Sequence, residues 1–174
     1  NTCSFIHPAQ QESVNTILEM AEFKKTGRAR KLIVAGCLVE RYRSDIRRDI
    51  PEVDAVVGTN ELEAIVALCE NRAESAPATA EPYLYHELTP RVRATPPHFA
   101  YVKIAEGCDH PCSFCIIPQL RGRFRSRRLE SLVAEVRRLF HQGVREINLI
   151  GQDTTGFGED YGLKDGLALM LDQL

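Results

Sequence analysis

The segment "FAYVKIAEGCDHPCSFC", residues 99–115, joins a predicted buried strand to a loop that carries three of the chain's six cysteines. Further along, apolar residues recur at helical spacing from Leu129 to Phe140, Gly143 can end that helix, and "REINLIG" predicts another strand. Strand, loop, helix and strand in this order predict a βαβ unit with parallel strands and a right-handed crossover. Ligands bind to such sheets at the loops that follow the strands, and one of these loops holds Cys108, Cys112 and Cys115.

The first third of the chain predicts a second α/β unit with a parallel sheet. A helix is expected between Pro8 and Gly27, with an apolar face made of Val14, Ile17, Leu18 and Ala21. The strings "KLIVAG" and "AVVG" are typical of short buried strands. Asn60 and Glu63 resemble a capping box for a further helix, whose apolar face would comprise Leu62, Ile65, Val66 and Cys69.

Residues 71–97 differ in composition from both units. They contain five of the nine prolines, and neither the helical nor the strand period persists there, which is typical of a linker. We therefore predict an N-terminal domain at 1–70, a linker at 71–97, and a second domain at 98–174.

The overall composition is that of an ordinary globular protein, with 44% hydrophobic residues, 26% charged residues and a net charge of −2. No apolar stretch reaches the roughly 18 to 20 residues that a membrane span needs. Five arginines between Arg121 and Arg128 are typical either of a solvated face or of contacts with RNA phosphates. The uneven spacing of the cysteines favours a reducing compartment, and hence a cytoplasmic location.

Three thiols at the spacing C-x3-C-x2-C can bind one metal centre from a single loop. Structural zinc sites and ordinary electron-transfer iron–sulfur clusters use four protein ligands. Three cysteines would leave one iron of a four-iron cluster with an open position, to which a substrate or cofactor could bind. Two alternatives remain, namely a zinc site completed by His98 or His110, and a group of reduced, buried cysteines.

The motif "CDHPCSFC" resembles the C-x3-C-x2-C signature of the radical S-adenosylmethionine enzymes, including the aromatic residue before the third cysteine. This resemblance implies a TIM-like barrel and a 4Fe-4S cluster held by Cys108, Cys112 and Cys115. It also implies that the fourth iron binds S-adenosylmethionine, which the reduced cluster cleaves to a radical that abstracts hydrogen. Family members contact the adenosylmethionine at positions that match Phe114, Gln152 and Asp153.

The strings "YVKIAEGC", "CSFCIIPQLRGRFRSR" and "GQDT" resemble one branch of that superfamily, the methylthiotransferases, which insert sulfur into a C–H bond and methylate it. "NTC" at Cys3 and "VAGC" at Cys37 match two of the three cysteines that hold a second 4Fe-4S cluster in the N-terminal domain of this family. The first of these three cysteines is expected before Asn1. Cys69 matches no family ligand and is expected to be buried.

Among the methylthiotransferases, "GQDTT" and "SFCIIP" favour the branch that modifies the β-carbon of an aspartate in ribosomal protein S-twelve. The alternative is the branch that modifies adenosine in tRNA. The expected partners are ribosomal protein S-twelve or the ribosomal small subunit, an electron donor, and RNA at Arg121 to Arg128. Because relatives carry a complete barrel and a further domain, we expect this chain to be an inactive fragment.

Two alternatives lie outside this family. One is an electron carrier, which would require a fourth cysteine for each cluster. The other is a zinc-stabilised nucleic-acid-binding module that uses the arginine run.

Overall fold

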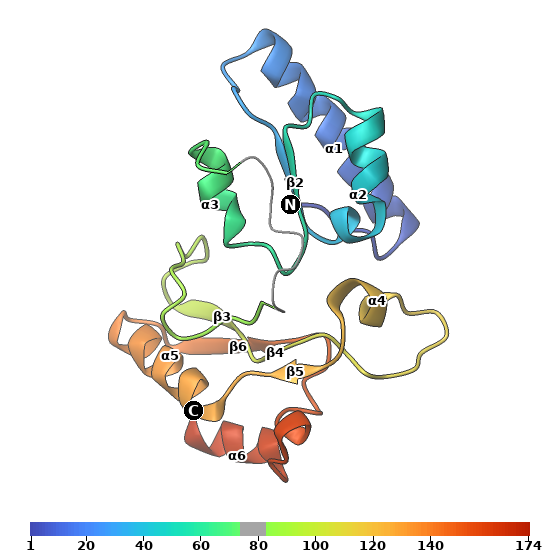
Figure 1. The fold of residues 1–174 in the computed structure, drawn as a ribbon. Coiled ribbons are helices and arrows are strands. Elements are labelled where there is room, and N and C mark those ends of the chain that lie inside the picture. The colour runs from blue at the N-terminus through green and yellow to red at the C-terminus, as the bar shows by residue number, and fades with distance from the viewer. Residues whose placement is uncertain (74–82) are drawn as a thin grey trace. The chain divides into compact units, whose positions relative to one another are not determined.

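The computed structural model describes residues 1–73 and 83–174 and divides the chain into two compact units, Asn1–Tyr83 and Leu84–Leu174 (Figure 1). Each unit combines helices with a pair of parallel strands, which confirms the predicted α/β class. Of the predicted linker at 71–97, residues 74–82 lie outside the described residues, while residues 83–97 contain neither helix nor strand. No helix in the described part of the chain is both long and apolar enough to cross a membrane.

In the first unit, helices cover two short parallel strands. Its elements in chain order are α1 (His7–Thr26), β1 (Ile33–Ala35), α2 (Cys37–Asp49), β2 (Ala55–Val57) and α3 (Ala64–Cys69). Val34 of β1 lies opposite Val56 of β2. Both valines are buried in a core with Ile17 of α1 and with Leu38 and Val39 of α2. The burial of these apolar side chains supplies the main favourable term for folding this unit.

The predicted helix between Pro8 and Gly27 is confirmed as α1, but its buried face differs from the expected one. Leu18 is exposed, so its assignment to the apolar face was wrong. Ser13 is buried instead, and its hydroxyl exchanges hydrogen bonds with the backbone N–H and C=O of Cys3 at 3.0 and 3.1 Å. A polar residue takes this core-facing position because the adjoining segment offers it backbone partners.

The predicted capping box before α3 is wrong. The side-chain oxygen of Asn60 accepts a hydrogen bond from the Tyr83 amide at 3.1 Å, and no side chain caps the start of α3. Leu68 is the residue of α3 that is buried, whereas Val66 and Cys69 are exposed. Val66 and Cys69, which were predicted to lie on the buried apolar face of this six-residue helix, therefore do not belong to it.

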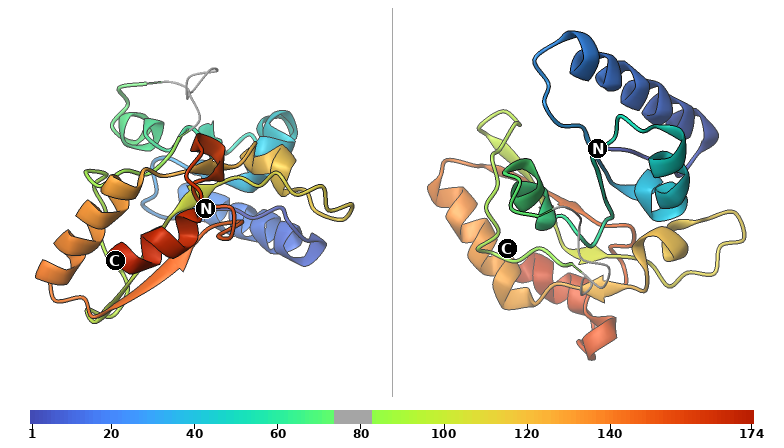
Figure 2. Two further views of the ribbon diagram at one scale, coloured as in Figure 1. Left: turned by 90° about the horizontal axis from the view of Figure 1, so that it is seen from below. Right: turned by 45° about the horizontal axis from the view of Figure 1, so that its top comes forward.

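The second unit contains the predicted βαβ arrangement. Its elements in chain order are β3 (Phe99–Lys103), β4 (Ala105–Glu106), α4 (Ile117–Arg121), β5 (Arg125–Ser126), α5 (Leu129–His141), β6 (Glu146–Ile150), the 3-10 helix η1 (Glu159–Tyr161) and α6 (Gly166–Gln173). β3 and β6 pair in parallel, and β4 and β5 pair antiparallel. Helices α5 and α6 both contribute side chains to the core beside β3 and β6 (Figure 2).

The strand predicted from "FAYVKIAEG" changes its hydrogen-bonding partner at Ile104. The amide of Ile104 donates to the carbonyl of Ile150 in β6 at 2.9 Å, whereas its carbonyl accepts from the amide of Arg127 at 2.8 Å. The chain then pairs with β5 through Ala105 and Glu106. The segment that follows thus leaves the sheet beside the C-terminal end of β6 and the N-terminal end of β5.

Helix α5 packs against the strands through Leu132, Val136 and Leu139, as its periodicity predicts. Phe140 is exposed, so its inclusion in the buried face was wrong. Glu135 is buried on this helix although it is charged, because it forms an ion pair with a buried arginine described below.

Candidate metal centre

The cysteine-bearing loop begins at Gly107, directly after β4. This glycine has a positive φ of +79°, and a Cβ atom there would lie 2.2 Å from the carbonyl oxygen of Arg123 and 2.6 Å from that of Gly122. Only glycine tolerates both this conformation and such a close approach of backbone. The amide of the next residue, Cys108, points to the Gly122 carbonyl at 3.4 Å. The two ends of the loop are therefore held together by backbone contacts.

The three cysteines of the loop are free thiols in three different environments. Cys108 is buried, Cys115 is half-buried and Cys112 is exposed, and the amide of Cys115 donates to the carbonyl of Cys112 at 3.1 Å. Soft thiolate ligands of this kind suit iron–sulfur clusters. Phe114 lies in the same turn with 86% of its surface exposed. The donor set and its accessible loop fit a cluster, and the ligand roles of the cysteines and the cofactor contact of Phe114 stay predictions.

A network of charges lies at the base of the loop. The buried carboxylate of Glu106 contacts the ammonium of Lys103 and lies 3.3 Å from Nη1 of Arg121, at the end of α4. It also accepts a hydrogen bond from the Gly107 amide at 3.3 Å. Pairing of this kind is what a buried carboxylate requires. The network connects the strand that precedes the loop to the helix that follows it.

The loop after β6 reaches the cysteine loop through Gln152. Its side-chain oxygen accepts a hydrogen bond from the Gly107 amide at 3.0 Å. This bond occupies the side-chain oxygen of Gln152. The contact of Gln152 with adenosylmethionine stays a prediction.

Asp153, the next residue, has a different role for each carboxylate oxygen. Oδ1 accepts hydrogen bonds from the amide and hydroxyl of Thr155 at 2.9 and 2.8 Å, and Oδ2 lies 3.0 Å from Nε2 of His110. Burial alone would raise the pKa of Asp153, but hydrogen bonds from Thr155 and Gly156 and the charge of His110 outweigh it, so the pKa is lowered. The carboxylate is therefore ionised at neutral pH.

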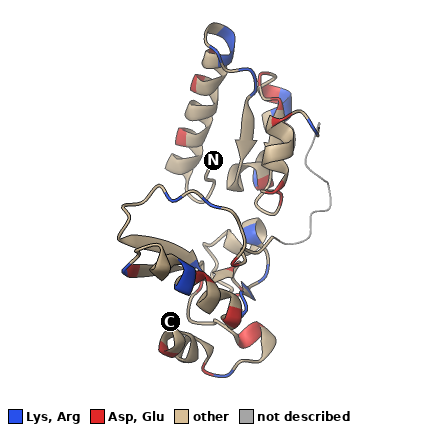
Figure 3. Ribbon diagram, turned by 90° about the vertical axis from the view of Figure 1, so that its left-hand side faces the viewer, with Lys and Arg blue, Asp and Glu red and all other residues tan. Residues whose placement is uncertain are grey.

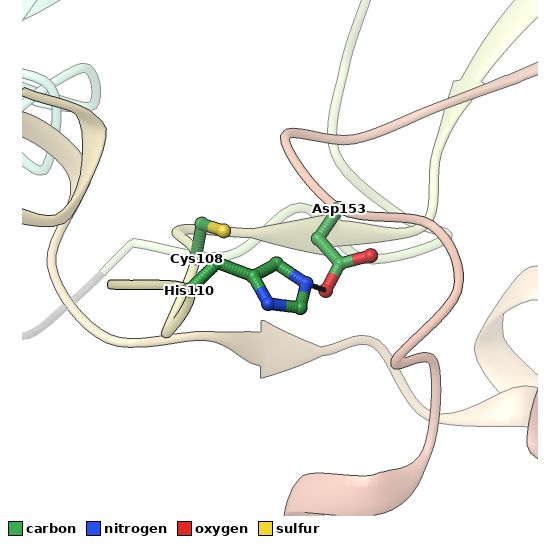
Figure 4. Close-up of side chains that lie close together, drawn as sticks. All are labelled: Cys108, His110 and Asp153. Atoms are coloured by element: carbon green, nitrogen blue, oxygen red, sulfur yellow. Dashed lines mark ion pairs between the residues drawn. The ribbon is translucent and has the colours of Figure 1, made fainter. Parts of the chain in front are cut away.

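Cys108, His110 and Asp153 form a compact group of metal-ligating side chains (Figure 4). One ligand atom from each lies within 4.8 Å of the others, and no other group of this kind occurs among the described residues. The sequence predicts His110 as a possible fourth ligand of a zinc site with the three cysteines, but it does not predict the contact between His110 and Asp153. The available signal was the pairing of the two predicted strands, because their following loops must then meet.

His98, the other histidine considered for a zinc site, lies at the opposite end of β3 from the cysteines. His98 directly precedes β3, and its carbonyl accepts hydrogen bonds from the amides of Arg145 and Glu146 at 2.7 and 3.0 Å, where β6 begins. A five-residue strand separates His98 from the cysteine loop, and each strand residue adds about 3.3 Å. His98 therefore does not complete a zinc site with these cysteines.

The arginine run does not form one continuous solvated face. The side chain of Arg127 is 1% exposed and pairs with the buried Glu135 at 2.5 Å, while Arg128 stacks over the ring of Tyr161 at 4.7 Å. In contrast, the side chain of Arg123 is 91% exposed. Basic and acidic segments are interspersed over this unit (Figure 3). The interpretation of the whole run as an RNA-binding face is therefore wrong for Arg127.

In the first unit, the segments that carry Cys3 and Cys37 lie side by side. Thr2 forms a parallel bridge with Gly36, and the Thr2 carbonyl accepts a hydrogen bond from the Cys37 amide at 3.2 Å. Gly36 has a φ of +114°, and a Cβ atom there would lie 2.6 Å from the Thr2 carbonyl, so glycine permits this approach. Cys3 is exposed and Cys37 is buried at the C-terminal end of β1. The ligand roles of both cysteines stay predictions.

Comparison with known proteins gives two family matches and many close relatives. Residues 1–58 match the uncharacterized protein family UPF0004, and residues 102–170 match the radical SAM superfamily. The whole chain aligns with the ribosomal protein uS12 methylthiotransferase RimO of Solibacter usitatus at 72% identity and covers 37% of the length of that protein. Its identity to the protein of the same name from Koribacter versatilis is 57%, with 44% of that protein covered. For the protein of the same name from Clostridioides difficile, the identity is 42% and the coverage 40%. The chain thus spans less than half the length of these relatives.

Proposed function

We propose that the chain is part of a radical S-adenosylmethionine methylthiotransferase whose whole protein adds a methylthio group to an aspartate of ribosomal protein S-twelve. The two family matches and the names of the relatives support this proposal. The reaction would take place at the β-carbon of that aspartate. The observation that carries the proposal is the single loop with three free cysteines, fixed at both ends and joined to the loop after β6. The names of the relatives favour the protein substrate over tRNA adenosine.

We assign Cys108, Cys112 and Cys115 as the ligands of a 4Fe-4S cluster with one iron left open for S-adenosylmethionine. When bound, these two cofactors supply the hydrogen-atom abstraction that an unactivated C–H bond requires. The chain's own residues position the site. Glu106 and Arg121 brace the loop at its base, and Gln152 fixes its first amide.

A second cluster would use Cys3 and Cys37. Their segments adjoin at the end of β1, where ligands bind in parallel α/β sheets. A 4Fe-4S cluster there needs a further ligand, because such clusters are held by at least three cysteines and these segments supply two. Six free cysteines suit a reducing cytoplasm, in which an electron donor would reduce the clusters.

The test uses the full-length protein, reconstituted anaerobically with iron and sulfide. Iron content and absorbance should show that the clusters have assembled, and the paramagnetic resonance of the reduced protein should change on addition of S-adenosylmethionine, as expected for an open iron. The enzyme is then incubated in parallel with ribosomal protein S-twelve and with tRNA that carries isopentenyl-adenosine, and mass spectrometry measures the added methylthio group. Modification of the tRNA alone would reverse the proposed substrate and keep the radical chemistry. Modification of neither substrate by a protein with intact clusters would refute the proposed activity.

A further inference from the structure

We propose that Cys108, His110 and Asp153 bind a single divalent transition-metal ion, such as Zn²⁺, when no iron–sulfur cluster is present. One ligand atom from each residue already lies within 4.8 Å of the other two. Figure 4 shows the thiol, the imidazole and the carboxylate on adjoining loops. This set shares only Cys108 with the three-cysteine motif. It therefore defines a site of its own, and it stands whether or not the proposed enzymatic activity is correct.

The donor set selects the class of ion. A thiolate, an imidazole nitrogen and a carboxylate oxygen suit Zn²⁺, Co²⁺ and related ions, whereas Mg²⁺ and Ca²⁺ prefer oxygen ligands. Zinc bonds of about 2.0 to 2.3 Å place tetrahedral ligands roughly 3.5 Å apart. The separations in this group are at most 4.8 Å, and Nε2 of His110 already lies 3.0 Å from Oδ2 of Asp153, so movements of about 1 Å suffice. His110 can move in this way because its side chain is 62% exposed. A water molecule can occupy the fourth position.

Asp153 is oriented for such a role by its own hydrogen bonds. Thr155 donates its amide and its hydroxyl to Oδ1, which leaves Oδ2 directed at His110. Hydrogen bonds of this type, behind the metal-binding atom, hold ligating carboxylates in place in metal sites. The bond between Gln152 and Gly107 fixes the two loops relative to each other. The site is therefore assembled before any ion arrives, except for a small movement of His110.

Charge also favours the site. Zn²⁺ bound to one thiolate, one carboxylate and one neutral imidazole has no net charge, so partial burial of the complex costs little. Because the Cys108 sulfur can serve only one centre, zinc and the iron–sulfur cluster would exclude each other.

The test uses Co²⁺ as a spectroscopic probe of the metal-free, reduced chain under anaerobic conditions. The expected result is one tightly bound Co²⁺ per chain, with a thiolate-to-cobalt charge-transfer band whose intensity corresponds to one thiolate. Addition of Zn²⁺ should displace the Co²⁺ and abolish the band. His110→Ala and Asp153→Asn should each weaken binding by about 100-fold or more, since loss of supporting residues alone costs 10- to 100-fold. Cys112→Ala, which removes a thiol of the motif but none of this site, should bind Co²⁺ like the unaltered chain.

The opposite pattern would overturn the proposal. If Cys112→Ala lost the ion and His110→Ala kept it, the three cysteines would be the ligands. A second control is His141→Ala, since His141 is an exposed histidine at the end of α5, and it should not change binding. Circular dichroism of each variant checks that the fold persists. Asp153→Asn keeps the shape of the side chain, so loss of binding in that variant with an intact fold supports the proposal independently.

Discussion

The amide nitrogen of Gly107 lies 3.0 Å from the side-chain oxygen of Gln152, which follows it by 45 positions in the sequence. This hydrogen bond joins the first residue of the cysteine loop to the loop after β6. The parallel register that places Lys103 opposite Ile150 brings the two loops together. The position of the cysteines thus depends on a residue that belongs to a different strand.

Replacement of Gln152 by alanine should loosen this junction. The buried Gly107 amide would lose its nearer acceptor and keep only the Glu106 carboxylate at 3.3 Å, which should lower the unfolding free energy by about 1 kcal/mol. Iron should also leave the reconstituted protein faster when a chelator is added. Urea unfolding and the rate of iron release measure the two effects. Gln119→Ala, at an exposed position of α4, is the matched control and should change neither quantity.

Replacement of Cys112 by alanine should abolish the adenosylmethionine-binding cluster. Two remaining thiolates cannot hold a four-iron cluster well, so iron content and cleavage of S-adenosylmethionine should both fall. Cys69→Ala is the control: Cys69 is exposed, so its loss should leave iron unchanged and alter stability by no more than about 0.5 kcal/mol. A full complement of iron in Cys112→Ala would contradict the assignment.

Gly107→Ala should disrupt the loop more than an ordinary glycine replacement does. Gly107 and Gly162 have nearly equal φ angles of +79° and +78°, but only at Gly107 would a Cβ meet the backbone, whereas Gly162 faces open space. The left-handed conformation alone costs alanine roughly 1 to 2 kcal/mol, and Gly162→Ala should show this cost. Gly107→Ala should lose more stability and also lose iron. Equal losses in the two variants would mean that the close approach does not matter.

The buried ion pair of the second unit predicts a large effect on stability. Arg127→Ala would leave the carboxylate of Glu135 buried with Arg91 as its remaining partner, at 3.2 Å. Breaking a buried pair in this way costs about 3 to 5 kcal/mol, with the lower value expected here because Arg91 compensates in part. Arg123→Ala, at an exposed arginine of the same run, should stay within about 0.5 kcal/mol. Chemical denaturation of both variants provides the comparison.

The lowered pKa of Asp153 predicts a pH-dependent contribution to stability. A carboxyl whose pKa is lower in the folded chain stabilises the fold above its unfolded pKa of about 3.9. That contribution is lost as the pH falls through the lower, folded pKa. The unfolding free energy of the unaltered chain should therefore decrease more than that of Asp153→Asn below about pH 4. If both decreased in parallel, the contribution of this carboxylate would be negligible.

Much of the fold follows from the sequence because its periodicities and glycines act locally. The apolar run of β3, the helical spacing of Leu132, Val136 and Leu139, and the glycine after α5 predict the βαβ unit without knowledge of any contact. Periodicity alone did not predict which apolar positions are exposed. Leu18 and Phe140 lie at the margins of their helical faces and remain in solvent, because each unit is small and offers little surface to cover them.

The candidate site was predictable only in part, for a physical reason. Cys108, Cys112 and Cys115 are close in sequence, so their spacing alone indicates a shared metal centre. The contacts between His110 and Asp153, and between Arg127 and Glu135, join residues on different elements. The sequence predicts that β3 pairs with β6 and that α5 packs on them, but it does not fix the register of the strands or the position of the helix along them, which decide these side-chain contacts.

The close backbone approach at Gly107 also bears on how this site could be altered by design or by evolution. Because the backbone of Gly122 and Arg123 closes the base of the cysteine loop at Gly107, the two ends of the loop are held together independently of the residues at its tip. Lengthening a flexible segment whose ends are already fixed costs only about 0.6 kcal/mol for each doubling of its length. A foreign sequence grafted between Asp109 and Cys115 should therefore leave the scaffold folded. This would allow new ligand spacings to be tried on an unchanged frame.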